Sequence, residues 1–171
     1  MWKHYFGPYA KIVGIDLEPK CKSLEEPGIC VHIGDQSNTD FLSSLVAEFG
    51  PPDIVLDDGS HQVKHINATF DLLFPLMRKG SVYMVEDLHT AYWPEYGGGL
   101  NNPLTFINRS KNFVDALNAH HTRGALPQDD FCNTVTSIHF YDSIVCIEKN
   151  NTPRGSDMIG PVAPVWEPRL K

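Results

Sequence analysis

Residues 53–61, with the sequence DIVLDDGSH, join a short apolar run to two aspartates, a glycine, a serine and a histidine. A second stretch, residues 80–89 (GSVYMVEDLH), repeats the design, because its apolar run also ends in two acids. Runs this short and this apolar are typical of buried parallel strands. Ligands of open α/β sheets bind just beyond the carboxyl ends of the strands. We therefore expect both acidic clusters at one rim of such a sheet.

The two acidic clusters together indicate a cation site. Asp57 and Asp58 close the first run, and Glu86 and Asp87 close the second. Four carboxylates at one rim repel one another unless a cation neutralises them. Such hard oxygen ligands suit Mg²⁺, Mn²⁺ or Ca²⁺, and a site with few protein ligands and several waters suits Mg²⁺. The alternative is that these acids cap helices or pair with nearby basic side chains.

His61 follows Asp58 by three residues, on a turn that leads into a predicted helix. A hydroxyl bound to a metal loses its proton more readily, and a nearby imidazole can accept that proton. His61 is therefore a candidate general base. The residues alone also allow His61 to be a metal ligand, or a helix-start residue with no part in the chemistry.

Two earlier apolar runs, residues 10–16 and 28–35, also end in an acid. An acid at the end of such a strand commonly accepts hydrogen bonds from ribose hydroxyls, which makes Asp16 a candidate for that contact. Asp35 with Gln36 is placed to contact an adenine amino group. Either acid could instead cap a turn, but two of them on neighbouring strands favour nucleoside binding.

The remaining pattern predicts an α/β fold. Helical spacing of apolar residues, or capping residues before them, predicts helices at 41–49, 63–77 and 111–121. Residues 134–141 and 143–148 predict a tight antiparallel pair, and residues 90–105 predict a long irregular segment. We therefore expect a mostly parallel sheet with an antiparallel C-terminal edge pair.

Composition excludes several classes of protein. A length of 171 residues suits one domain with a core, and a formal net charge of −7 argues against a general nucleic-acid or anionic-membrane binder. No apolar run approaches the roughly 20 residues that span a bilayer. The first residues hold no apolar signal segment, so we expect a cytoplasmic protein. The four cysteines form no Cys-x-x-Cys pair and are expected to be reduced thiols.

Tyr92, Trp93 and Tyr96 precede three consecutive glycines, 97–99. Aromatic faces suit sugar rings and other flat apolar surfaces, so the segment is a candidate for a mobile flap over a substrate. The alternative is a packed loop whose glycines only serve turns.

Residues 10–16, 57–61 and 85–93 together resemble the metal-dependent O-methyltransferases that act on sugars of macrolides and related natural products. Cephalosporin-hydroxylase-like proteins share the pattern, and the likeness covers about residues 2–150. The resemblance implies a Rossmann-like class I fold that uses S-adenosylmethionine, with Mg²⁺ held by Asp58, Glu86 and Asp87 and with His61 as the general base. It also implies cofactor contacts from Asp16, Asp35, Gln36 and Asp57, and an acceptor covered by Tyr92 and Trp93.

The chain departs from the family pattern at its start. The family places a strand and a glycine-rich turn before a helix whose last turns match residues 2–6, whereas this sequence begins inside that helix. We therefore expect the first, central strand to be missing between residues 10–16 and 53–57. Residues 1–150 would form a methyltransferase-like domain that is incomplete at the N-terminus, followed by a tail at 151–171. A sheet with exposed edges tends to associate, which favours a homo-oligomer.

The function expected from these features is Mg²⁺-dependent, S-adenosylmethionine-dependent methylation of a hydroxyl on a sugar or glycosylated small molecule. One alternative is a catalytically inactive remnant or binding subunit with the same fold. A metal-dependent hydrolase that activates water with the same acids is a third hypothesis.

Overall fold

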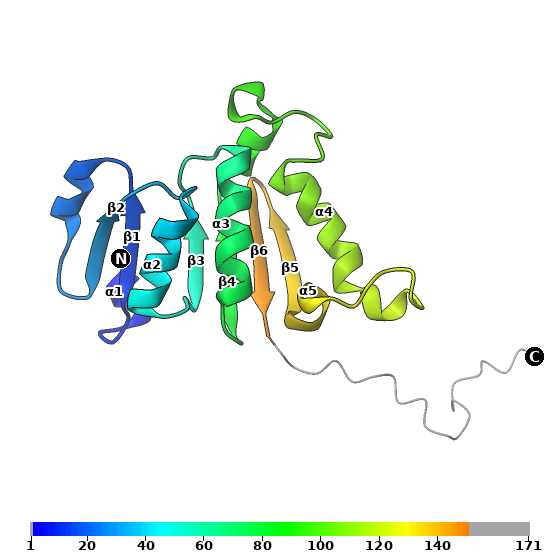
Figure 1. The fold of residues 1–171 in the computed structure, drawn as a ribbon, viewed down its shortest axis with the longest axis horizontal. Helices are drawn as coiled ribbons and strands as arrows, with labels where there is room; N and C mark the ends of the chain where they lie inside the picture. The colour runs from blue at the N-terminus through cyan, green and yellow to red at the C-terminus, as the bar shows by residue number, and fades with distance from the viewer. Residues whose placement is uncertain (1, 151–171) are drawn as a thin grey trace, which may run out of the picture.

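The computed structural model describes residues 2–150, and the predicted tail lies outside these residues. All six predicted strands form (Figure 1). β1 (Ile12–Asp16) and β2 (Ile29–Ile33) make a parallel pair. The other sheet has the order β3-β4-β6-β5, with β3 and β4 parallel and β6 antiparallel to both of its neighbours. Its strands are β3 (Ile54–Asp57), β4 (Ser81–Val85), β5 (Val135–Tyr141) and β6 (Ile144–Lys149). The α/β arrangement with an antiparallel C-terminal edge is therefore confirmed.

A gap separates the two sheets. β1 and β3 do not pair, and within residues 2–150 no strand lies between them, although both strands line the same cavity. Figure 1 shows the resulting break in the sheet beside α2. This break is where the sequence predicts that a central strand is missing. Ile54 and Leu56 of β3 are 49% and 38% exposed, and Leu56 lines the cavity between the two sheets.

The helices follow from local capping and spacing. Asn38 accepts hydrogen bonds from the backbone N–H groups of Asp40 and Phe41, and α2 (Thr39–Phe49), which contains the predicted helix at 41–49, starts directly after this cap. The predicted apolar stripe on α3 (Val63–Leu76) is buried, as expected for a helix that covers a sheet. The other elements are α1 (Trp2–Phe6), η1 (Pro19–Leu24), η2 (Leu88–Tyr92), η3 (Pro94–Tyr96), α4 (Phe106–Leu117), η4 (Ala119–His121) and α5 (Asp130–Thr134).

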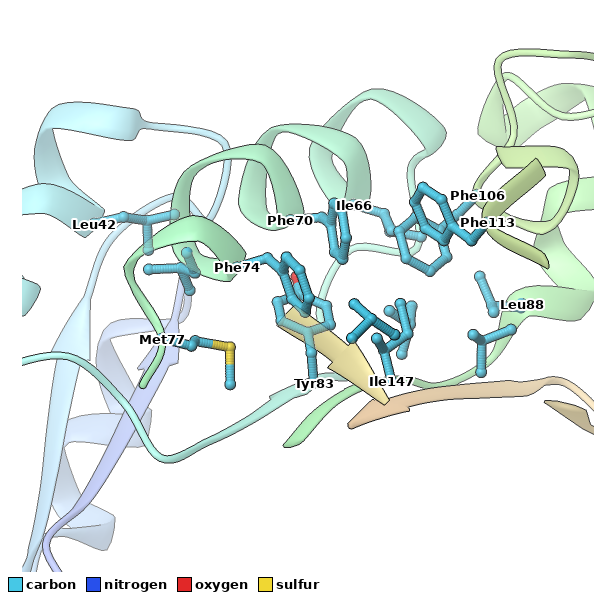
Figure 2. Close-up of a cluster of buried hydrophobic side chains, with 14 residues drawn as sticks. Leu42, Ile66, Phe70, Phe74, Met77, Tyr83, Leu88, Phe106, Phe113 and Ile147 are labelled. Atoms are coloured by element: carbon cyan, nitrogen blue, oxygen red, sulfur yellow. The ribbon is translucent and has the colours of Figure 1, made fainter. Parts of the chain in front are cut away.

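An aromatic cluster joins α3 and α4 to the larger sheet (Figure 2). The Phe70 ring lies 4.7 Å from that of Phe74 and 5.0 Å from that of Tyr83, between ring centroids. Phe106 and Phe113 bring α4 into the same cluster. Buried aromatic side chains dominate the packing of a core. The cluster therefore fixes the helices on β4, whose carboxyl end carries the second acidic cluster.

Three expectations about element ends were wrong. The helix predicted at 111–121 runs from 106 to 117, because the Thr105 hydroxyl caps it by accepting from Asn108 N at 3.3 Å. α3 ends at Leu76, one residue before the predicted end at 77. The antiparallel pair turns on two residues, Asp142 and Ser143, rather than on Asp142 alone. The described residues contain no helix long and apolar enough to cross a membrane.

Candidate functional site

The acids that close the strands meet at one rim, as the sequence predicts. A cavity of about 420 Å³ is lined by Asp16 at the end of β1, Asp35 after β2, Asp57 at the end of β3, and Asp58 directly after β3. Glu86 follows β4 directly, and its backbone N–H donates to Asp57 O at 3.0 Å. Parallel strands end at the same edge of a sheet, which explains why residues so far apart in sequence share this rim.

Asp58, His61 and Asp87 converge at this rim. Their ligand atoms all lie within 4.8 Å of one another. The two imidazole–carboxylate distances to Asp87 are both 3.8 Å, from His61 Nε2 and from His89 Nδ1. Two carboxylates and an imidazole that converge in this way fit a divalent cation. Within residues 2–150, Glu86 does not belong to this cluster, so its part in metal binding stays a prediction.

The backbone is strained at two residues of the cluster. His61 has a φ of 57° and Asp87 a φ of 52°, both in the left-handed region. For residues with a Cβ atom this conformation costs roughly 1–2 kcal/mol. Strain of this kind persists where the surrounding structure holds it, and it gathers at functional sites. Each left-handed turn follows a strand end and redirects the chain at the rim.

The turn of the last hairpin supports the second acidic loop. Ser143 Oγ accepts from the backbone N–H of His89 at 2.9 Å and lies 2.7 Å from His89 Nδ1. Ser143 O also accepts from Leu88 N at 2.9 Å. Ser143 could not be identified from the sequence, because a serine in a hairpin turn carries no signal of a contact with a loop 54 positions earlier.

Asp57 is buried behind the rim rather than exposed on it. The residue is 6% exposed, and its Oδ1 accepts from Gln36 Nε2 at 2.9 Å. Burial raises the pKa of the Asp57 carboxyl, and the bond from Gln36 partly opposes that shift. Burial also raises the pKa of the neighbouring Tyr83 hydroxyl well above its ordinary range. The structure thus brings Gln36 and Asp57, both predicted cofactor contacts, against each other.

Asp16 and Asp35 each hold a turn at the end of a strand. Asp16 Oδ1 accepts from Glu18 N at 2.8 Å, and Asp35 Oδ1 accepts from Ser37 N at 2.7 Å. These backbone hydrogen bonds lower the pKa of both carboxyl groups. The turn-capping alternative is therefore present in the structure, and it leaves both groups charged beside the cavity.

The aromatic segment after β4 is a packed loop with exposed rings. The backbone N–H of Gly98 donates to Trp93 O, and that of Gly99 donates to Ala91 O, both at 2.9 Å. A Cβ atom on Gly98 would lie 2.4 Å from Ala91 O, so this position requires glycine. Tyr92 and Trp93 are nevertheless 46% and 43% exposed, and the Trp93 ring lies 4.9 Å from that of His89. The two aromatic residues therefore border the acidic loop.

Two helix residues that the sequence analysis did not single out anchor the end of this loop. Asn67 Nδ2 donates to Leu104 O at 2.8 Å, and Arg109 donates to Asn67 Oδ1 at 3.2 Å. Arg109 also pairs with Asp71 on the same face of α3. An asparagine one turn after a helix start gives no sequence signal for such a role.

The strand order and the acidic rim define an α/β methyltransferase fold. The chain superposes on the structure of the methyltransferase MycE from the mycinamycin pathway, in complex with Mg, SAH and mycinamycin VI, with a TM-score of 0.81 and 32% identity. That superposition covers 99% of this chain and 42% of the MycE chain. A second MycE structure, with Mg and SAH, matches with a TM-score of 0.80.

Sequence comparison identifies the relatives. The chain is 38% identical to demethylmacrocin O-methyltransferase of Streptomyces fradiae and 33% identical to mycinamicin VI 2''-O-methyltransferase of Micromonospora griseorubida, each over 99% of this chain and 42% of the relative. It is 37% identical to a rhamnosyl tetracenomycin-C 2'-O-methyltransferase of Streptomyces olivaceus, over 87% of this chain and 40% of the relative. The chain is thus a homologue of the sugar O-methyltransferases of macrolide and tetracenomycin pathways. It spans about two fifths of their length, and no protein-family model matches it.

Proposed function

We propose that this chain belongs to a Mg²⁺-dependent O-methyltransferase that transfers a methyl group from S-adenosylmethionine to a hydroxyl of a sugar-bearing small molecule. The observation that carries the proposal is the convergence of Asp58, His61 and Asp87 at the rim of a cavity that Asp16 and Asp35 also line. Homology to sugar O-methyltransferases supports the same function. The MycE structures, which hold Mg and SAH, support both cofactors.

Asp16 and Asp35 are the proposed contacts to the nucleoside part of the cofactor. Both carboxylates stay charged, since backbone N–H groups lower their pKa, and both lie beside one cavity. A charged carboxylate accepts hydrogen bonds from ribose hydroxyls and from an amino group. We propose Asp16 for the ribose and Asp35 for the adenine amino group.

The proposed protein ligands of Mg²⁺ are Asp58, which follows β3, and Glu86 and Asp87, which follow β4. Bound Mg²⁺ would lower the pKa of the acceptor hydroxyl. His61 Nε2 accepts the hydroxyl proton, and the Asp87 carboxylate 3.8 Å away stabilises the imidazolium that forms. The acceptor oxygen forms a bond to the methyl carbon as the carbon–sulfur bond breaks, which yields a methyl ether and S-adenosylhomocysteine. Positioning and electrostatics provide the rate.

Tyr92 and Trp93 are the proposed acceptor contacts. Their half-exposed rings lie on the loop that continues from Asp87, so a sugar placed on the rings is also near the acidic cluster. Apolar faces of a sugar ring pack on aromatic rings of this kind.

Calorimetry of the chain with Mg²⁺ and with S-adenosylhomocysteine tests the proposal, followed by assay of methyl transfer to a deoxysugar-bearing macrolide. We expect Asp58→Asn to abolish Mg²⁺ binding and metal-dependent methyl transfer. Asp142→Asn, which removes an exposed carboxylate in the hairpin turn, serves as the matched control. Failure of the wild-type chain to bind either ligand would contradict the proposal.

No observation favours the hydrolase or the inactive remnant, because the relatives are methyltransferases and the acid and histidine set is present. The domain division at residue 150, a homo-oligomeric state and a cytoplasmic location are further proposals. They rest on the sequence pattern and, for the oligomer, on the unpaired strand edges.

A further inference from the structure

We propose that Gln36 is a positioning residue that holds the loop of residues 57–61, and with it Asp58 and His61, in place for the metal. The inference rests on the proposed function for the presence of a metal. It assigns Gln36 a different role from the adenine contact predicted from the sequence.

The Gln36 amide is used almost completely inside the protein. Its Nε2 donates to Asp57 Oδ1 at 2.9 Å and to Thr69 Oγ1 at 3.2 Å, while its Oε1 accepts from Ser60 N at 2.6 Å. An amide nitrogen has two donor hydrogens, and both have partners here. The side chain therefore hydrogen-bonds to both ends of the Asp57–Ser60 turn, and its amide has no N–H left to donate to an adenine.

Gly59 shows how closely the turn lies on this amide. A Cβ atom on Gly59 would lie 2.1 Å from Gln36 Oε1 and 2.9 Å from its Cδ, far inside contact distance. A side chain at position 59 would therefore force the Gln36 amide away from the turn, whereas the φ of Gly59 is not in the left-handed region. The motif Asp-Asp-Gly-Ser-His and Gln36 form one unit, although 21 residues separate Gln36 from Asp57.

Gln36 also bridges the break between the two sheets. It follows β2, whereas Asp57 ends β3 and Thr69 lies in α3, and β1 does not pair with β3. Thr69 is 5% exposed, and its hydroxyl lies 3.2 Å from Gln36 O and 3.0 Å from His65 O. Backbone pairing does not tie the two sheets together beside the turn, so this side-chain network ties the 57–61 loop to its neighbours.

The geometry of the metal cluster depends on the Gln36 hydrogen bonds. Asp58 and His61 lie on either side of Gly59 and Ser60, which pack against Gln36, and both must meet Asp87, which lies on a different loop. Mutation of a group that orients a metal ligand commonly lowers metal affinity by roughly 10- to 100-fold. Loss of the Gln36 bonds should therefore weaken metal binding without removal of any ligand.

Gln36→Met tests the inference, because methionine has a similar length and no amide. We expect Mn²⁺ affinity, measured by electron paramagnetic resonance, to fall on the order of 10- to 100-fold. We also expect faster hydrogen exchange of the backbone amides at 57–61. Gln128→Met makes the same chemical change at an exposed position, and both readouts should match the wild type.

The pair Gln36→Glu and Asp57→Asn provides a rescue. Gln36→Glu alone sets a carboxylate against Asp57 and should weaken Mn²⁺ binding at least as much as Gln36→Met. In the double variant the asparagine amide donates to the new glutamate, and the net charge equals that of the wild type. The double variant should therefore recover Mn²⁺ affinity relative to Gln36→Glu, a result that a loss of general stability would not produce.

The outcomes separate this inference from the proposed function. If the wild-type chain binds no Mn²⁺, the proposed metal site is contradicted. The hydrogen-exchange rates at 57–61 in wild type and Gln36→Met then still test whether Gln36 holds the loop. Unchanged exchange in Gln36→Met overturns the inference. A loosened loop with wild-type Mn²⁺ affinity also overturns it, because Gln36 would then hold the loop without effect on the ligands.

Discussion

The side chain of His61 is proposed to accept a proton, and its backbone is in the left-handed conformation, which is unfavourable for any residue with a Cβ atom. Its φ of 57° suits glycine, so His61→Gly removes both the imidazole and the strain. His61→Ala removes the imidazole alone. We expect His61→Gly to be more stable than His61→Ala by about 1 kcal/mol, measured by urea unfolding. Equal stability of the two variants would contradict the strain at this residue.

Asp35 predicts a pH dependence of stability. Its pKa is lowered below the ordinary 3.8 by hydrogen bonds from the backbone N–H and hydroxyl of Ser37. A carboxyl whose pKa is lower in the folded chain contributes stability above its unfolded pKa. That contribution is lost as the pH falls through the folded pKa. We expect the difference in Tm between wild type and Asp35→Asn to shrink from about pH 5 to about pH 2.

Some residues of the site could be predicted from the sequence and others could not. Asp16, Asp35 and Asp58 were predictable at the rim, because each lies at or just beyond the end of an apolar run typical of a buried strand. The partners of Gln36 and Ser143 were not predictable, since both act through contacts with loops more than 20 positions away. No local pattern records such a contact.

At the scale of elements, the C-terminal end of α3 is stabilised by a side chain from β6. Lys149 is 7% exposed, and its Nζ donates to Phe74 O at 2.7 Å and to Pro75 O at 3.1 Å. Lys149→Met would leave both carbonyls without this donor. We expect a loss of about 1–3 kcal/mol in the free energy of unfolding. Lys79→Met, at an exposed position, should change it by less than about 0.5 kcal/mol.

Element types were more predictable than element ends. The strands and the stripe on α3 follow from periodicity, which reports burial directly. The ends of α3 and α4 depend on Lys149 and Thr105, whose hydrogen bonds compete with the apolar pattern. The 3-10 turns of η2 and η3 were hidden for a similar reason, because backbone contacts within the loop create them.

At the scale of the molecule, β1 and β3 face each other across the break without backbone hydrogen bonds between them, so each sheet has an open strand edge there. Unpaired edges beside apolar side chains promote association. We expect sedimentation velocity to show association that increases with protein concentration. Ile54→Lys places a charge on the exposed side of β3 and should reduce it. A wild-type chain that stays monomeric across the concentration range would contradict this expectation.

Ser143 carries a consequence for the order in which the molecule is made. Its hydroxyl supports His89, although it lies in the β5–β6 hairpin, 54 positions further along the chain. During synthesis the ribosome therefore releases Asp58, His61 and Asp87 long before the turn that supports their rim exists. A nascent chain halted before residue 143 would therefore hold Asp58, His61 and Asp87 and still lack the Ser143 hydroxyl that supports the His89 loop.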